Sequence, residues 1–168
     1  MTAPDFIAVY DFETAIEAAL YGVFVAEGIA DTFYSGSRQD FDRPRPRVEL
    51  YFSVGSQTGH IRPEATYYRP DAFAGSLTVR IVSNSKPGTD STAEHSAYRA
   101  TVRNIMAKAR GLLVADAAGD DTLLPYHTIN DIVQSGSNPS YEGQEGFFET
   151  SLNYDLKFNI RPAAWPGE

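Results

Sequence analysis

The sequence predicts an α+β fold, in which a mostly antiparallel sheet of four or five strands carries two helices packed on one face. Apolar and polar residues alternate with period two in several segments, most clearly over 148–160. Helical periodicity marks only two segments, one near the start of the chain and one past its middle. Strands therefore follow one another in runs, which is typical of an α+β arrangement with antiparallel pairing.

Composition indicates one domain spanning 1–168, with an extended tail over 161–168. A chain of 168 residues with 42% hydrophobic content can form one substantial core. Fourteen basic against 22 acidic residues give a net charge of −8, which opposes nonspecific binding to nucleic acid and to anionic membranes. The acidic N-terminal segment lacks the pattern of a signal peptide, so we expect a soluble protein that is not exported.

The first helix is expected over 11–27, where apolar residues recur at helical spacing and Gly28 is placed to end it. A second helix is expected to begin at Ser91, because Ser91 and Glu94 have the spacing of a capping box. It is expected to end between residues 111 and 115. Its apolar stripe consists of Tyr98, Val102, Ile105, Met106, Ala109 and Leu113.

The last strand is the clearest element of the chain. Its 13 residues would span roughly 43 Å at about 3.3 Å per residue, whereas ordinary strands have about five or six residues. We therefore expect it either to bend across its own sheet or to overhang it and offer an edge. A turn-rich connection is expected over 55–73. The strands expected are 32–34, 47–54, one marked by Leu77, Val79 and Ile81, 126–134 and 148–160.

An arginine-rich segment interleaved with prolines precedes the strand that begins at residue 47. Arginine forks favour carboxylate and phosphate partners, so the segment is a solvated loop, a protein interface or a DNA contact. Asp40 and Asp42 lie within it and weaken the DNA interpretation. The arginines are Arg38, Arg43, Arg45 and Arg47.

Trp165, the only tryptophan, lies in the tail and is a candidate anchor into a groove, the alternative being packing on its own domain. No cysteine, HExxH, GxSxG, GxGxxG or P-loop pattern is present. The histidines His60, His95 and His127 are too far apart for a helical metal pair. We therefore expect no catalytic residues, no cofactor and no metal site.

The order and texture of the elements over about 12–162 resemble the tail terminator, or tail completion, proteins of long-tailed bacteriophages and phage-like gene transfer agents. An N-terminal helix precedes the proline-introduced strand PRVELYFSVG. GSLTVRIVS then precedes a helix opening with HSAYRATVRNIM. A glycine-rich acidic turn leads to a long terminal strand ending FNIRPAAWP.

The resemblance implies a structural virion protein, not an enzyme, that forms a homo-oligomeric ring, usually a hexamer. The ring would cap the head-proximal end of the tail tube, end tube polymerisation and join the tail to the head connector. Its partners would be other copies of the chain, the tail-tube protein and the head–tail connector. DNA would pass through the channel without sequence-specific recognition, and no membrane would be involved. Its place would be the tail of a virion or phage-like particle assembled in the host cytoplasm.

A head-to-tail ring uses two different patches on each subunit. The final strand, including Tyr154, and the arginine-rich segment are the candidate patches. We expect that exchanging Arg43, Arg45 and Arg47 for serine impairs assembly and leaves the monomer folded.

Three other functions remain open. The chain is alternatively another head–tail connector or tail-tube component, which filament formation would reveal. A small ligand-binding or enzymatic α+β domain would need a pocket with convergent polar groups. A nucleic-acid adaptor using the arginine-rich segment would bind DNA in a salt-dependent way.

Overall fold

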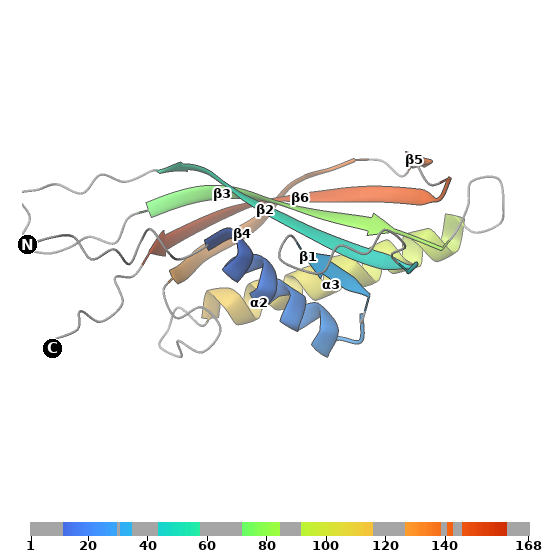
Figure 1. Ribbon diagram of the computed structural model, residues 1–168, viewed down its shortest axis with the longest axis horizontal. Coiled ribbons are helices and arrows are strands. Elements are labelled where there is room, and N and C mark those ends of the chain that lie inside the picture. Colours follow the sequence, from blue (N-terminus) through green and yellow to red (C-terminus); the bar gives the residue numbers. More distant parts are fainter. Residues whose placement is uncertain are drawn as a thin grey trace, which may run out of the picture.

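The structure is a computed structural model that describes residues 12–29, 31–34, 44–57, 72–84, 92–115, 127–138, 141–142 and 146–160. These ranges form two helices on one side of a mostly antiparallel sheet (Figure 1), as the sequence predicts. The elements in chain order are α2 (Phe12–Ala26), β1 (Thr32–Tyr34), β2 (Arg47–Gln57), β3 (Ala72–Val82), α3 (Thr92–Ala115), β4 (His127–Ser137), β5 (Tyr141–Glu142) and β6 (Phe148–Ile160).

The strands run in the order β1-β2-β3-β6-β4, and the short β5 also pairs with β6. β1 is parallel to β2, whereas the other described pairings are antiparallel. β6 is the strand predicted over 148–160, but it is central. β3 pairs with it from Glu149 to Asn159, and β4 and β5 together cover its other edge from Phe148 to Ile160 except at Thr150 and Ser151. Of the two alternatives predicted for this strand, overhang does not occur among the described residues, because the neighbouring strands β3 and β4 are nearly as long as β6.

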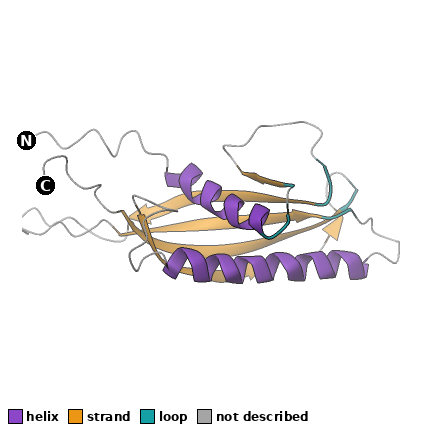
Figure 2. Cartoon of the chain, turned by 90° about the horizontal axis from the view of Figure 1, so that it is seen from below, coloured by secondary structure: helices purple, strands orange, loops and turns teal. Residues whose placement is uncertain are grey.

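Both helices lie on the same face of the sheet (Figure 2). α2 contacts β1 and β2, and α3 contacts β4, so the helices cover opposite halves of the apolar face. β2, β3 and β6 contribute alternate residues to the core, as period-two alternation requires. The largest fully buried side chains are Phe24, Phe158, Ile16, Leu20, Leu50, Leu77, Ile81, Met106, Leu113, Ile129, Leu152 and Leu156.

The end of α2 shows why the sequence predicted this boundary well. Gly28 adopts a φ of 91°, a conformation that glycine reaches without steric cost. The Ile29 amide donates to the Phe24 carbonyl, and the Gly28 amide donates to the Val25 carbonyl. This pair of bonds is a Schellman motif, which satisfies carbonyls that the last helical turn leaves free. The chain is thereby turned into β1.

Three strands extend beyond their predicted bounds. β3 begins at Ala72, inside the predicted connection, and β2 and β4 continue to Gln57 and Ser137. β2 and β4 contain bulges, between Val54 and Ser56 and at two places in β4. The extra residue in each bulge breaks strict alternation, so the pattern fades in the sequence where pairing continues in the structure.

Gly75 provides room for an aromatic cluster at one end of the core. A Cβ atom at Gly75 would lie 2.4 Å from the Phe52 ring and 2.8 Å from the Ser53 carbonyl oxygen, closer than real contacts. Phe52 meets Phe158 edge to face at 5.9 Å, and Phe73 stacks on Phe158 at 5.6 Å. Only glycine lets the Phe52 ring cross the neighbouring strand at this level.

Candidate interaction surfaces

The outer edge of β2 is sealed by two glutamates from α2. Glu17 is fully buried, and its Oε1 atom accepts a hydrogen bond from the Phe52 amide at 2.7 Å. The Oε1 atom of Glu13 accepts one from the Val54 amide at 2.9 Å. These amides point away from β3, toward the outer edge of β2, and a further strand would otherwise pair with them there. The carboxylates take the place of that strand.

Helix and strand geometry explains why the two glutamates fit. Residues four apart on a helix rise about 6.0 Å, and alternate residues of a strand are about 6.6 Å apart. Glu13 and Glu17 therefore match the Val54 and Phe52 amides when the helix runs opposite to the strand. Nearer the start of β2, β1 takes over, and the Val48 amide donates to the Asp31 carbonyl at 3.0 Å.

The helix-free face of β2, β3 and β6 carries a largely buried ion cluster. Arg47 and Glu49 each have only 3% of their side chain exposed, and their Nε and Oε1 atoms are 2.8 Å apart. Arg80, on β3, lies between two carboxylates and donates to Glu49 at 2.8 Å and to Glu149 at 2.7 Å. The Tyr51 hydroxyl also donates to Glu49, at 2.9 Å. The cluster ties three neighbouring strands together.

This cluster holds Glu49 and Arg80 in their charged forms. Burial alone would raise the pKa of Glu49, but hydrogen bonds from Arg47, Tyr51 and Arg80 outweigh it and lower the pKa to about 2. Burial would likewise lower the pKa of Arg80, yet the hydrogen bonds to Glu149 and Glu49 raise it. The four charges balance within the chain, so this face is a poor site for a free anion.

The opposite edge of the sheet, formed by β4, differs from the β2 half in strand pairing, in exposure and in its ion pair. Its inner edge pairs with β6, and no described strand pairs with its outer edge. Val133 is 48% exposed. The ion pair at this edge joins the Arg110 Nη2 and Asp131 Oδ1 atoms at 2.8 Å, with 55% and 39% of the two side chains exposed. The β4 edge is therefore the more open of the two.

A bulge at Asn130 gives β4 its local shape. Because of this extra residue, Ile129 and Ile132 both face the core although they are three positions apart. The Asp131 carboxylate accepts a hydrogen bond from the Ile132 amide at 2.9 Å and so supports the bulge. The same carboxylate accepts a hydrogen bond from Arg110 on α3, which ties the helix to the edge strand.

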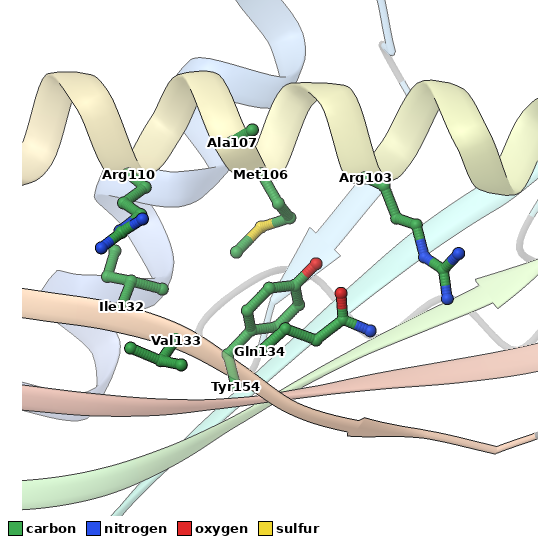
Figure 3. A pocket seen from close by; sticks show the side chains of 8 residues that line it. All are labelled: Arg103, Met106, Ala107, Arg110, Ile132, Val133, Gln134 and Tyr154. Atoms are coloured by element: carbon green, nitrogen blue, oxygen red, sulfur yellow. The ribbon is translucent and has the colours of Figure 1, made fainter.

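A hollow of about 250 Å³ lies between α3 and β4 (Figure 3). Arg103 and Arg110 reach from α3 at its two ends, and the ring of Tyr154 stands up from β6 between them. The Nε atom of Arg103 is buried and has no hydrogen-bond partner among the described residues. Burial raises the pKa of the Tyr154 hydroxyl, while the charge of Arg103 acts in the opposite direction. The lining residues are Arg103, Met106, Ala107, Arg110, Ile132, Val133, Gln134 and Tyr154.

His95 lies in the first turn of α3, where the sequence predicted it. It is buried, its Nε2 atom is 2.8 Å from the Thr150 hydroxyl, and its ring stacks on Phe148 at 5.4 Å. Burial and the charge of Arg99 lower its pKa. This environment disfavours the protonated imidazole and fits a structural role. His127 begins β4, and His60 lies outside the described residues.

The structure separates the residues predicted as interface candidates. Arg45 is exposed, with its guanidinium 4.0 Å from the centre of the Phe147 ring. Arg47 is buried in the ion cluster, and Tyr154 is nearly buried and lines the hollow. Arg38, Arg43 and Trp165 lie outside the described residues. An interface role for these residues stays a prediction.

The expected effect of the triple serine exchange needs correction. Arg47 pairs inside the chain with Glu49, so its removal would leave a buried carboxylate without that partner and destabilise the monomer. A clean test of the arginine-rich segment must therefore retain Arg47.

Sequence reasoning missed the two strongest polar features of the fold. Glu13 and Glu17 lie four residues apart beside the apolar stripe of α2, and this spacing was the available signal. Glu49, Arg80 and Glu149 come from three strands whose register the sequence does not reveal. Their meeting could not be predicted from alternation alone.

Within the described ranges, no three His, Asp or Glu side chains gather in a way that could hold a metal ion. In the same part of the chain, neither helix is both long and apolar enough to cross a membrane.

No family model matches the chain, and no curated protein matches it. Among solved structures, the chain is similar to a chain of the "Virion of native gene transfer agent (GTA) particle". The identity is 11%, the match covers 89% of this chain and 96% of that one, and the TM-score is 0.43. Likeness of this degree leaves the function to be argued from the residues themselves.

Proposed function

We propose that the chain is a structural protein of a phage-like particle, a tail terminator that forms a ring on the head-proximal end of the tail tube. The ring ends tube polymerisation and provides the surface for the head connector. It acts without catalysis or a cofactor.

The observation that carries this proposal is the difference between the two sheet edges. A closed ring with head-to-tail contacts needs two unlike patches on each subunit. The β2 edge is blocked by the carboxylates of Glu13 and Glu17, whereas the β4 edge is open and lies beside the hollow. Unlike edges favour a heterologous contact over continued sheet growth in both directions. The choice of a tail terminator rests on the element order over about 12–162, which resembles that of the tail terminator family.

The first test is native mass spectrometry of the full chain over a concentration series, with negative-stain imaging and added tail tubes. We expect a hexameric ring with an open centre, bound at one end of each tube and halting its elongation. Filaments formed by the chain alone would identify a tube component instead. A monomer that ignores tubes and is stabilised by a small ligand in a thermal screen would favour a binding domain.

The arginine-rich segment allows a second test of the ring. Exchanging Arg38, Arg43 and Arg45 for serine while keeping Arg47 should reduce the ring fraction and leave the circular dichroism spectrum unchanged. Arg45 is exposed, so its loss spares the core. An unchanged ring fraction and normal tube length would remove this segment from the contact.

A further inference from the structure

We propose that the hollow between α3 and β4 is a carboxylate-binding site that takes the Glu13 side chain of a second copy of the chain, with Arg103 as its main donor. The inference deepens the proposed function and rests on it, because this contact would join neighbouring subunits of the ring. It assigns the two unlike patches of a head-to-tail contact to the α3 side of one copy and the α2 side of the next.

The lining of the hollow favours a negatively charged occupant. Arg103 and Arg110 line it, whereas no carboxylate of the described residues does. Gln134 and Tyr154 stand between the two arginines and add an amide and a hydroxyl that can donate hydrogen bonds (Figure 3). Burial raises the pKa of Tyr154, so its hydroxyl keeps the proton that it can donate. Four side chains with donor groups therefore surround a space of about 250 Å³.

Arg110 shows how an α3 arginine binds a carboxylate at this edge. Its Nη2 atom is 2.8 Å from the Asp131 Oδ1 atom. Arg103 lies seven residues earlier on the same helix, about two turns away, and lines the same hollow beside the neutral Gln134. Within the described ranges Arg103 forms no hydrogen bond or ion pair, and of its nitrogens only Nε is buried without a partner. The terminal nitrogens of Arg103 can therefore bind a carboxylate that enters from solvent.

Charge complementarity makes a second copy the occupant. Among the described residues, α3 carries four basic side chains and one acidic side chain, whereas the segment 12–34, with α2 and β1, carries four acidic side chains and no basic one. α2 contacts β1 and β2, and α3 contacts β4, so these opposite charges lie over opposite halves of the sheet. In a head-to-tail ring the α3 half of one copy faces the α2 half of the next, and unlike charges meet there.

Glu13 is the acidic residue of this segment that is best placed to reach a second copy. Glu17 is fully buried, and Glu27 pairs with Lys108 of its own α3. Asp31 is half-buried. Glu13 is exposed at the outer edge of β2, on the side of the sheet opposite to the hollow. The Glu13 carboxylate is therefore the candidate ligand of the site.

The register of the sheet places Glu13 level with the hollow. The Oε1 atom of Glu13 binds the Val54 amide, which leaves Oε2 without a partner among the described residues. Val54 pairs with Gly75, which pairs with Leu156. Leu156 pairs with Ile132, and Ile132 lines the hollow. A cyclic ring has no shift along its axis, so with the strands along that axis Glu13 of one copy meets the hollow of the next.

Charge reversal tests the contact. Arg103→Glu and Glu13→Arg each place like charges at it, so each variant alone should raise the concentration needed for half-maximal ring formation at least about tenfold. Native mass spectrometry over a concentration series, with and without tail tubes, measures that concentration. Lys157→Glu and Asp155→Arg make the same charge changes at exposed positions on the helix-free face of β6 and should assemble like the wild type. Circular dichroism should show all four variants folded.

A matched neutral variant keeps the test valid if Arg103→Glu does not fold. Arg103→Gln introduces no charge at this half-buried position and should also weaken assembly, because it removes the main donor to the carboxylate. If Glu13→Arg assembles like the wild type while the Arg103 variants do not, the hollow binds another carboxylate and the assignment to Glu13 is wrong.

A mixing experiment separates a second copy from any other acidic partner. In an alternating ring of Arg103→Glu and Glu13→Arg subunits, each contact joins one acidic and one basic side chain. Arg103 of one variant meets Glu13 of the other, and the two introduced residues meet each other. The mixture should therefore assemble at about the concentration that the wild type needs, as should the double variant. No recovery in the mixture, or equal assembly of the reversed variants and their controls, would overturn the proposal.

Adding tail tubes separates this inference from the proposed function. If Arg103→Glu and Glu13→Arg form rings and cap tubes like the wild type, the carboxylate site is wrong and the terminator function stands. If ring assembly depends on this pair but no ring binds tubes, the carboxylate site stands and the terminator function fails. If the wild type stays monomeric with and without tubes, both fail.

Discussion

The β2 half and the β4 half of the sheet use the same kinds of side chain in opposite ways. In the β2 half, Glu17 and the pair Arg47–Glu49 are buried and hydrogen-bonded inside the chain. In the β4 half, the pair Arg110–Asp131 is exposed, and the buried Nε atom of Arg103 has no partner within the part of the chain that the structure describes. The β2 half has its polar groups paired within the chain, whereas the β4 half retains polar groups that a partner molecule can bind.

Burial decides what each charged group contributes. A buried ion pair is costly to break, because the remaining charge is left out of water. An exposed pair is solvated in either case, and its net contribution to stability is small. The β2 half should therefore carry the stability of the fold, whereas the β4 half should carry its associations.

The largest effect should come from Glu49→Gln. The change removes the carboxylate that pairs with buried Arg47, and breaking such a pair costs about 3 kcal/mol or more. Urea denaturation measures the loss. As a control, Arg47→Met combined with Glu49→Leu should recover much of the stability, because no buried charge of this pair remains. A loss below about 0.5 kcal/mol for Glu49→Gln would show that the cluster is solvated.

Alanine exchanges of Glu17 and Glu13 compare two depths on one edge. Glu17→Ala leaves the buried Phe52 amide without its acceptor and should cost roughly 2 kcal/mol. Glu13→Ala should cost less than about 0.5 kcal/mol, because Glu13 is exposed and water can replace it at the Val54 amide. Both changes place alanine on the same helix, so the difference in unfolding free energy reports burial. Equal losses would contradict the sealed-edge interpretation.

Acid should weaken the β2 half in a defined pH window. The folded pKa of Glu49 is about 2, against an ordinary value of 4.5, so its contribution is present above pH 4.5 and is lost as pH falls toward 2. Glu49→Gln should flatten this part of the curve of unfolding free energy against pH. An unchanged slope between pH 4.5 and 2 in Glu49→Gln would contradict the assignment of this loss to Glu49.

The lowered pKa of His95 acts separately. Stability is lost as pH falls below 6.5, because the unfolded imidazole binds a proton more readily than the folded one.

The smallest effect should come from Asp131→Asn at the open edge. The side chain is exposed, and the asparagine oxygen can still accept the Ile132 amide. The urea midpoint should therefore stay within the error of the measurement. A destabilisation comparable to that of Glu49→Gln would show that the two halves do not differ as described.

Prediction from the sequence succeeded where local pattern and local structure coincide. The bounds of β6 follow from unbroken alternation, and the end of α2 follows from Gly28, which reaches a positive φ without cost. It fell short where a bulge interrupts the pattern between Gln134 and Gly136, beyond which β4 continues to Ser137. Among the interface candidates, Tyr154 proved to line a hollow that exists only because α3 crosses above β4.

The sequence by itself determined the α+β class, the order of the elements and the apolar face of each, because these depend on residues close together in the chain. Only the tertiary structure decided that β6 is central, that Glu17 seals the β2 edge and that Arg47 is buried. These features depend on register and packing between segments far apart in the chain, such as Arg80 and Glu149, which are 69 residues apart. Local periodicity carries no information on which strand lies beside which, and burial of a charge is decided by that neighbour.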